Sequence, residues 1–112
     1  MPTYEKYKLD LSYQEGNLAS IDIEMDATFS MTDVAVVLEV RDSGGRLIFR
    51  KKSTVDFTIS GQNFSIELLP ADTIGRAGKH NYEIDFFNVQ NQPFATIGGY
   101  FTISKQVNTA AL

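Results

Sequence analysis

The chain has 112 residues, with 14 acidic and 10 basic side chains and a formal net charge of −4. This length fits one domain and suffices to bury a core without metal or disulfide cross-links. The sequence contains no cysteine, which excludes disulfides, thiolate catalysis and cysteine-bound zinc, and its acidic balance argues against a general nucleic-acid binder.

Apolar and polar residues alternate along most of the chain, which is the period of a strand with one wet face. The expected strands centre, in chain order, on residues 7–11, 21–25, 34–40, 47–50, 55–59, 64–68, 82–86 and 101–103. Turns are expected at 42–45 and 60–63, and Pro70 begins a short helical turn over 70–76. Seven or eight short strands with glycine-rich turns predict an antiparallel, immunoglobulin-like β-sandwich.

The domain is expected to span residues 1–104, with a flexible tail over 105–112. Residues 1–6 are polar, and no apolar run approaches the roughly 20 residues that a transmembrane helix needs, so neither a targeting segment nor membrane binding is expected. Gly78 followed by Tyr82 at the start of a late strand predicts a tyrosine corner, in which the phenol bonds to upstream backbone. The pair Gly98 and Gly99 predicts a β-bulge.

Candidate catalytic and metal-binding groups are few. His80, the only histidine, lies in a polar stretch and is expected to be exposed and structurally neutral. The segment 42–45 is interpreted as a turn rather than a serine nucleophile. Asp22, Glu24 and Asp26 project from one strand face at intervals of about 7 Å, which is too far apart for one calcium ion, so basic cross-strand partners are expected instead. We therefore predict no enzyme activity, no catalytic residue, no cofactor and no metal.

Side-chain parity points to a binding surface. If Val34, Val36, Leu38, Leu47, Phe49, Tyr82, Ile84, Phe86, Phe101 and Ile103 face the core, their apolar neighbours face outward. Those neighbours are Ala35, Val37, Ile48, Phe87, Val89 and Tyr100. An exposed apolar sheet face predicts a protein–protein interface, unless another part of the chain covers it.

Four segments, 40–45, 66–73, 77–85 and 98–103, resemble virion domains of tailed bacteriophages. These are the N-terminal sandwich of the baseplate upper protein and related head-fibre or decoration modules. The resemblance spans about residues 35–104; it departs from the family pattern at 79–81, and no fibre extension follows residue 104. It implies a structural protein of the virion, made in the host cytoplasm, that docks on baseplate, neck or capsid proteins as a homo-oligomer.

Two alternatives remain open. A carbohydrate- or ligand-binding module would use exposed loop aromatics such as Tyr13 or Phe94. A chaperone or inhibitor domain would instead add a strand to its partner through an exposed sheet edge.

Overall fold

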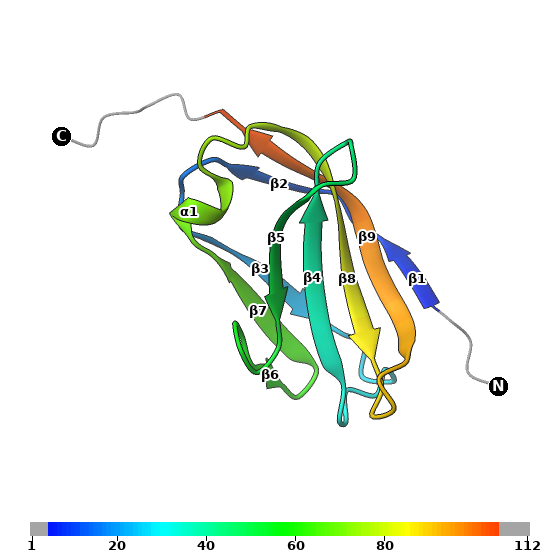
Figure 1. Ribbon diagram of the computed structural model, residues 1–112. Coiled ribbons are helices and arrows are strands. Elements are labelled where there is room, and N and C mark those ends of the chain that lie inside the picture. The colour runs from blue at the N-terminus through cyan, green and yellow to red at the C-terminus, as the bar shows by residue number, and fades with distance from the viewer. Residues whose placement is uncertain (1–4, 106–112) are drawn as a thin grey trace.

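The structure, a computed structural model, describes residues 5–105 of the chain, which fold into two packed sheets (Figure 1). Within that range, sheet A has the strand order β1-β9-β8-β4-β5, with β2 also paired to β9, and sheet B has the order β3-β7-β6. The strands are β1 (Glu5–Lys8), β2 (Leu11–Gln14), β3 (Ala19–Glu24), β4 (Ala35–Arg41), β5 (Leu47–Lys52), β6 (Ile59–Ser60), β7 (Asn63–Leu68), β8 (Gly78–Phe87) and β9 (Pro93–Ser104).

This arrangement confirms the predicted immunoglobulin-like β-sandwich. The strand pairings are antiparallel except that β1 and β2 both run parallel to β9. The predicted first strand is interrupted at Leu9 and Asp10, so it appears as two short strands along one neighbour. The predicted tail falls largely on residues 106–112, outside the described residues. Within residues 5–105, no helix has the length and apolar character needed to cross a bilayer.

The core lies between the two sheets and follows the predicted parity closely. Val36, Leu38 and Val40 of β4 are completely buried, and Ile66 and Leu68 of β7 face them from the other sheet. The remaining core residues include Ile21, Phe64, Tyr82, Ile84, Phe86, Phe101 and Ile103. Alternation with a period of two is therefore what brings the two apolar faces together.

The predictions for the strands over 47–50 and 55–59 are wrong in part. Val55 is 71% exposed in a turn, so the strand expected over 55–59 shrinks to β6. At the start of β5, Val40 pairs with Phe49 but Arg41 pairs with Leu47, which leaves Ile48 as the extra residue of a bulge. Ile48 consequently packs against the core, while Leu47, which was expected inside, is 44% exposed.

The predicted helical turn is α1 (Pro70–Thr73), which connects sheet B to sheet A. The Asp72 carboxylate accepts a hydrogen bond from the Leu69 backbone N–H at 2.8 Å and so caps the turn. It also lies 2.8 Å from the Lys51 ammonium, and both side chains are mostly buried. This ion pair ties α1 to β5.

Tyr82 is buried as expected, but its hydroxyl donates to the backbone carbonyl of Leu9, across the neighbouring strand β9, and not to the nearby connection that a tyrosine corner uses. The register between β8 and β9 continues unbroken through Gly98 and Gly99, so the predicted bulge is absent there. The need for Gly99 is steric: a Cβ at this position would lie 2.4 Å from the Leu9 oxygen.

Candidate functional site

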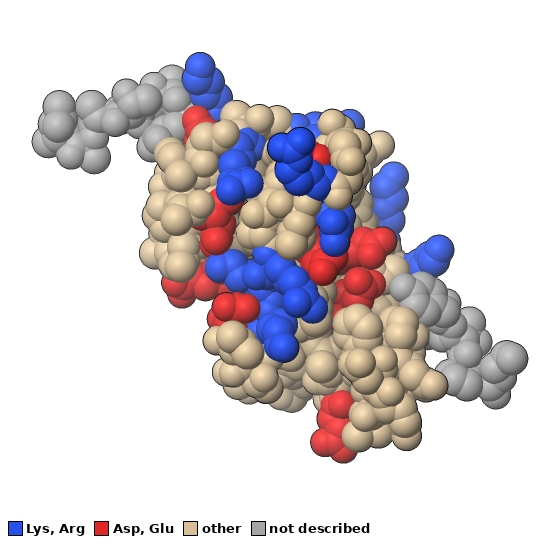
Figure 2. Space-filling model, in the orientation of Figure 1, with Lys and Arg blue, Asp and Glu red and all other residues tan. Residues whose placement is uncertain are grey.

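The outer face of sheet A carries charged side chains in cross-strand rows. One row runs Arg50, Glu39, Glu83, Gly98 and Lys8 across five strands in register. The next row runs Lys52, Val37, Asp85, Thr96 and Lys6. Each row has basic side chains at both ends and a carboxylate near its middle. Figure 2 shows the blue and red side chains lying side by side across this face.

A shallow groove of about 560 Å³ lies on this face, where Gly98 leaves the outer side of β9 without a side chain and the backbone of Gly99 follows it. We call it the sheet A groove. Its walls are formed by Lys8, Glu39, Arg41, Asn81, Glu83 and Tyr100, and the backbone of Tyr82 forms part of its floor. The volume falls within the range that small-molecule sites occupy.

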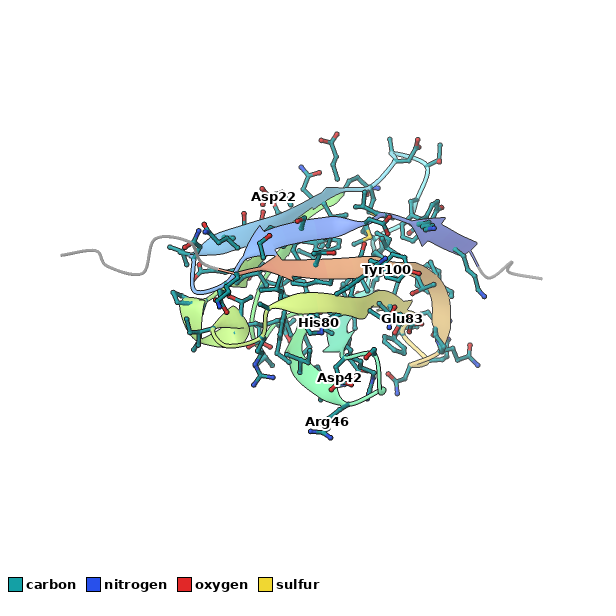
Figure 3. The ribbon with its side chains drawn as sticks, turned by 90° about the horizontal axis from the view of Figure 1, so that it is seen from above. Asp22, Asp42, Arg46, His80, Glu83 and Tyr100 are labelled. Atoms are coloured by element: carbon teal, nitrogen blue, oxygen red, sulfur yellow. The ribbon has the colours of Figure 1, made fainter. Side chains whose placement is uncertain are left out.

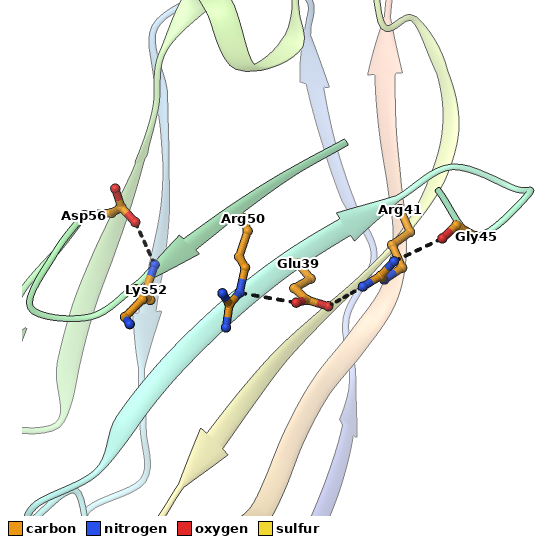
Figure 4. A network of polar contacts seen from close by, with 6 residues as sticks. All are labelled: Glu39, Arg41, Gly45, Arg50, Lys52 and Asp56. Atoms are coloured by element: carbon orange, nitrogen blue, oxygen red, sulfur yellow. Dashed lines mark hydrogen bonds and ion pairs between the residues drawn. The ribbon is translucent and has the colours of Figure 1, made fainter. Parts of the chain in front are cut away.

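Glu39 is held by two arginines at one side of the groove (Figure 4). One carboxylate oxygen lies 2.9 Å from Arg41, whose guanidinium also donates to the Gly45 carbonyl at 3.1 Å. The other oxygen lies 3.3 Å from the Arg50 Nε. This wall is therefore fixed by a small network that links β4, β5 and the turn between them.

Of the two glutamates in the groove, Glu83 is the one whose ionised form the fold disfavours. Partial burial raises its pKa above the ordinary value, and the neighbouring Asp85 raises it further by charge repulsion and by a side-chain hydrogen bond. Lys6 opposes this rise only in part. Folding therefore disfavours the ionised form of Glu83, because burial and the neighbouring Asp85 both oppose its negative charge.

Tyr100 forms the aromatic part of the groove (Figure 3). Its side chain is 42% exposed, and the Lys79 ammonium lies 3.9 Å from the ring centroid in a cation–π contact. Its backbone N–H donates to the Asp10 carboxylate at 3.0 Å, which anchors β9 to the β1–β2 connection.

The predicted apolar interface is not one continuous patch. Val37 and Phe87 point outward and are half-buried, and Val89 is 72% exposed in the hairpin after β8. Tyr100, however, pairs with Asn81 toward the other end of β8, and charged residues of the two rows lie between them. Ile48 is not one of the outward-facing apolar residues, because the β5 bulge turns its side chain toward the core.

Other single-residue predictions also change. His80 is buried, not exposed, because it pairs with Phe101 on the inner face; its Nε2–H donates to the Arg76 carbonyl at 2.7 Å. Tyr13 packs its ring against Phe101, and Phe94 stacks on Phe29, so neither is an exposed loop aromatic.

The carboxylates of β3 also differ from expectation. Asp22 accepts hydrogen bonds from Ser20 and Ser65 in place of the expected basic partners. In the described part of the chain, no group of three or more metal-ligating side chains is placed to hold an ion. The sheet A groove itself was missed from the sequence, where only the paired glycines marked it.

No protein-family model and no curated protein matches this chain. Solved structures do. The extracellular domains of the voltage-gated sodium channel beta4 subunit, whose parallel homodimers are linked to cell–cell adhesion, match with a TM-score of 0.50 and 11% identity, over 94% of this chain and 92% of that chain. Fibronectin(III)-like modules of Clostridium thermocellum CbhA match with a TM-score of 0.47 and 10% identity, over 93% and 94%. At 11% identity, the likeness to the beta4 subunit domains supports the immunoglobulin-like sandwich fold and nothing narrower.

Proposed function

We propose that this chain is a non-catalytic docking domain of a tailed-bacteriophage virion, which binds another virion protein through the outer face of sheet A. The resemblance of residues 35–104 to sandwich domains of virion proteins supports the proposal that the chain belongs to a virion. The observation that carries the docking surface is the sheet A groove, a concave feature of about 560 Å³ on a face that the fold leaves open.

The docking face combines two kinds of contact. The groove offers charged groups that select a partner by complementarity, among them Lys8 and Glu83, and it also offers the exposed ring of Tyr100. At the other end of the face, Val37, Phe87 and Val89 offer apolar area. Each part is small, so stable attachment requires repeated copies of the pair, as a symmetric homo-oligomer on a virion would provide.

The test is incorporation into particles. Phage or prophage lacking the gene is complemented with variants, and the protein content of purified particles is measured alongside the thermal melt of each isolated domain. Val89→Asp and, in the groove wall, Lys8→Glu are expected to reduce incorporation at least about tenfold, a loss of roughly 1.4 kcal/mol, without lowering the melting temperature appreciably.

Val55→Asp is the matched control, because Val55 is 71% exposed and Val89 is 72% exposed, yet Val55 lies in the turn after β5. Normal incorporation of both docking-face variants, or equal loss with Val55→Asp, would reject this face as the docking surface.

A second candidate function, saccharide binding, is favoured by one observation. The groove brings the Tyr100 ring together with the Asn81 amide and the Glu83 carboxylate, which is the mixture of aromatic and polar groups that sugar rings contact. A glycan array tests this function. Glycan binding that Tyr100→Ala abolishes would favour saccharide binding, whereas an absence of glycan binding would favour protein docking.

A further inference from the structure

The four outer edges of the two sheets differ in how well they are protected. β6 has only two residues. The end of β5 is closed by its own turn, since the Lys52 N–H donates to the Asp56 carboxylate and the Lys52 carbonyl accepts from the Asp56 N–H. The edge of β1 and β2 is broken at Leu9 and Asp10. β3 is a continuous six-residue strand with β7 as its one neighbour in the described sheet. Natural sheets seldom leave such an edge open without a reason.

The open part of the β3 edge can be assigned to particular residues. The Met25 N–H donates to the Gln62 carbonyl on the β7 side, so the alternate residues Ser20, Asp22 and Glu24 direct their backbone groups to the free edge. The Ser20 carbonyl already accepts from the Tyr13 hydroxyl at 3.2 Å. The backbone groups of Asp22 and Glu24 therefore form the open part.

An apolar trench lies beside these two residues. It has a volume of about 350 Å³ and is bounded by β3 and by the β1 end of sheet A. Its apolar lining comes from Tyr7, Leu9, Ile23, Met25, Phe29 and Ile97. Tyr7 is 45% exposed and Leu9 is 44% exposed, so part of this apolar lining lies at the surface.

The rim of the trench is acidic. Asp22, Glu24 and Asp26 line it, and none of the ion pairs found in residues 5–105 involves them. Asp22 and Glu24 point to the outer side of sheet B, opposite the buried Ile21 and Ile23. Figure 3 shows Asp22 on the outside of the sandwich. A strand lying along β3 would thus meet carboxylates on one face and apolar side chains on the other.

We propose that the β3 edge is a strand-addition site for an extended segment of a partner protein in which Lys or Arg alternates with apolar residues. The segment pairs with the backbone of Asp22 and Glu24, places its apolar side chains in the trench, and places its basic side chains beside the two carboxylates. A second copy of β3 is disfavoured as the occupant, because its own carboxylates would lie opposite these. This site is independent of the docking face on sheet A.

The probe is a blocked peptide of alternating valine and lysine, six residues long to match β3, and a valine–glutamate peptide of equal length is its control. Amide hydrogen exchange and chemical shifts of the isotope-labelled chain are followed during titration. The lysine peptide is expected to slow exchange at the Asp22 and Glu24 amides, while Ile21 and Ile23, already paired with β7, stay unchanged. Unchanged exchange at Asp22 and Glu24 at the highest peptide concentration would overturn the proposal, as would equal binding of the glutamate peptide.

Three variants test the backbone pairing, the charge contact and the apolar contact of the peptide separately. Glu24→Pro removes an edge N–H while leaving the β7 side intact, and it is expected to abolish the protection. Glu24→Lys should weaken binding of the lysine peptide about tenfold. Glu67→Lys, on the neighbouring strand, makes the same charge change and should have little effect on that binding. Leu9→Lys should weaken binding and Leu47→Lys should not, since both leucines are 44% exposed but lie at different edges. Equal effects within either matched pair would overturn the proposal, and so would protection that appears only with self-association.

Discussion

The Tyr82 hydroxyl donates a hydrogen bond to the backbone carbonyl of Leu9, although 73 residues separate the two in sequence. Tyr82 lies opposite Gly99 in the neighbouring strand, and both face the interior of the sandwich. Because Gly99 has no side chain, the phenol reaches across β9 and the Leu9–Asp10 segment approaches closely. This bond fixes the interrupted edge strand, and with it the wall of the apolar trench.

Tyr82→Phe is expected to lower the free energy of unfolding by about 1 kcal/mol, the net value of a hydrogen bond whose acceptor keeps some access to water. Urea denaturation measures this. Tyr13→Phe is the control, because its hydroxyl makes an exposed bond of 3.2 Å to Ser20 and should cost less. Equal losses in the two variants would contradict a special role for the Leu9 contact.

Tyr82 also predicts a dependence of stability on alkaline pH. Burial, followed by the charges of Asp10 and Tyr13, raises the pKa of Tyr82 from 10.0 to about 12. The contribution of the protonated Tyr82 to the free energy of unfolding is complete below pH 10, where the folded and the unfolded chain both keep the phenol proton. Between pH 10 and 12 the unfolded chain loses the proton first, so the free energy of unfolding falls as the pH rises through this window. Urea titrations in this window should fall less steeply for Tyr82→Phe; parallel slopes would contradict the assignment.

Gly99→Ala is expected to destabilise the fold by about 1–3 kcal/mol, because the added Cβ would lie 2.4 Å from the Leu9 oxygen and 2.7 Å from the Asp10 carboxylate. Chemical denaturation measures the loss. Gly44→Ala meets only the Asp42 carboxylate at 3.4 Å and should be nearly neutral. Hydrogen exchange should also rise along β1 and β2 in the Gly99 variant, and unchanged exchange there would contradict displacement of that edge.

Lys51→Ala is expected to cost about 1.5–3 kcal/mol, because it leaves the mostly buried Asp72 carboxylate without its cation. Thermal and urea denaturation measure the effect. Arg50→Ala, one residue earlier, removes an ion pair whose arginine side chain is 51% exposed, so its cost should stay below about 1 kcal/mol. A larger loss with Arg50→Ala would mean that the Glu39 network, not α1 docking, stabilises β5.

Glu83→Gln is expected to stabilise the chain at pH 7. The raised pKa of Glu83, caused first by burial and then by Asp85, means that folding penalises the ionised carboxylate. The gain from glutamine should be complete above the folded pKa and should vanish as the pH falls below the unfolded value, where both states are protonated. Denaturation curves between neutral and acidic pH test this, with Glu67→Gln as an exposed control. A gain that persists at acidic pH would point to packing instead of charge.

The strands could be predicted from the sequence because inward residues such as Val36, Leu38 and Val40 alternate without interruption. The same rule failed at Leu47 and Ile48. One extra residue in a bulge reverses which side chains of the strand face the core on one side of the bulge, and the types of these two residues do not predict a bulge. It failed at Val55 as well, where an apolar residue lies in an exposed turn.

The sequence by itself determined the β-sandwich and the buried rows of strands such as β4, β7 and β8, since both depend on local alternation. Only the tertiary structure decided the surfaces. Glu39, Glu83 and Lys8 become one row, and Glu24 comes to lie beside Leu9, through pairings between segments distant in sequence. Such pairings depend on the register of whole sheets, which no single segment encodes.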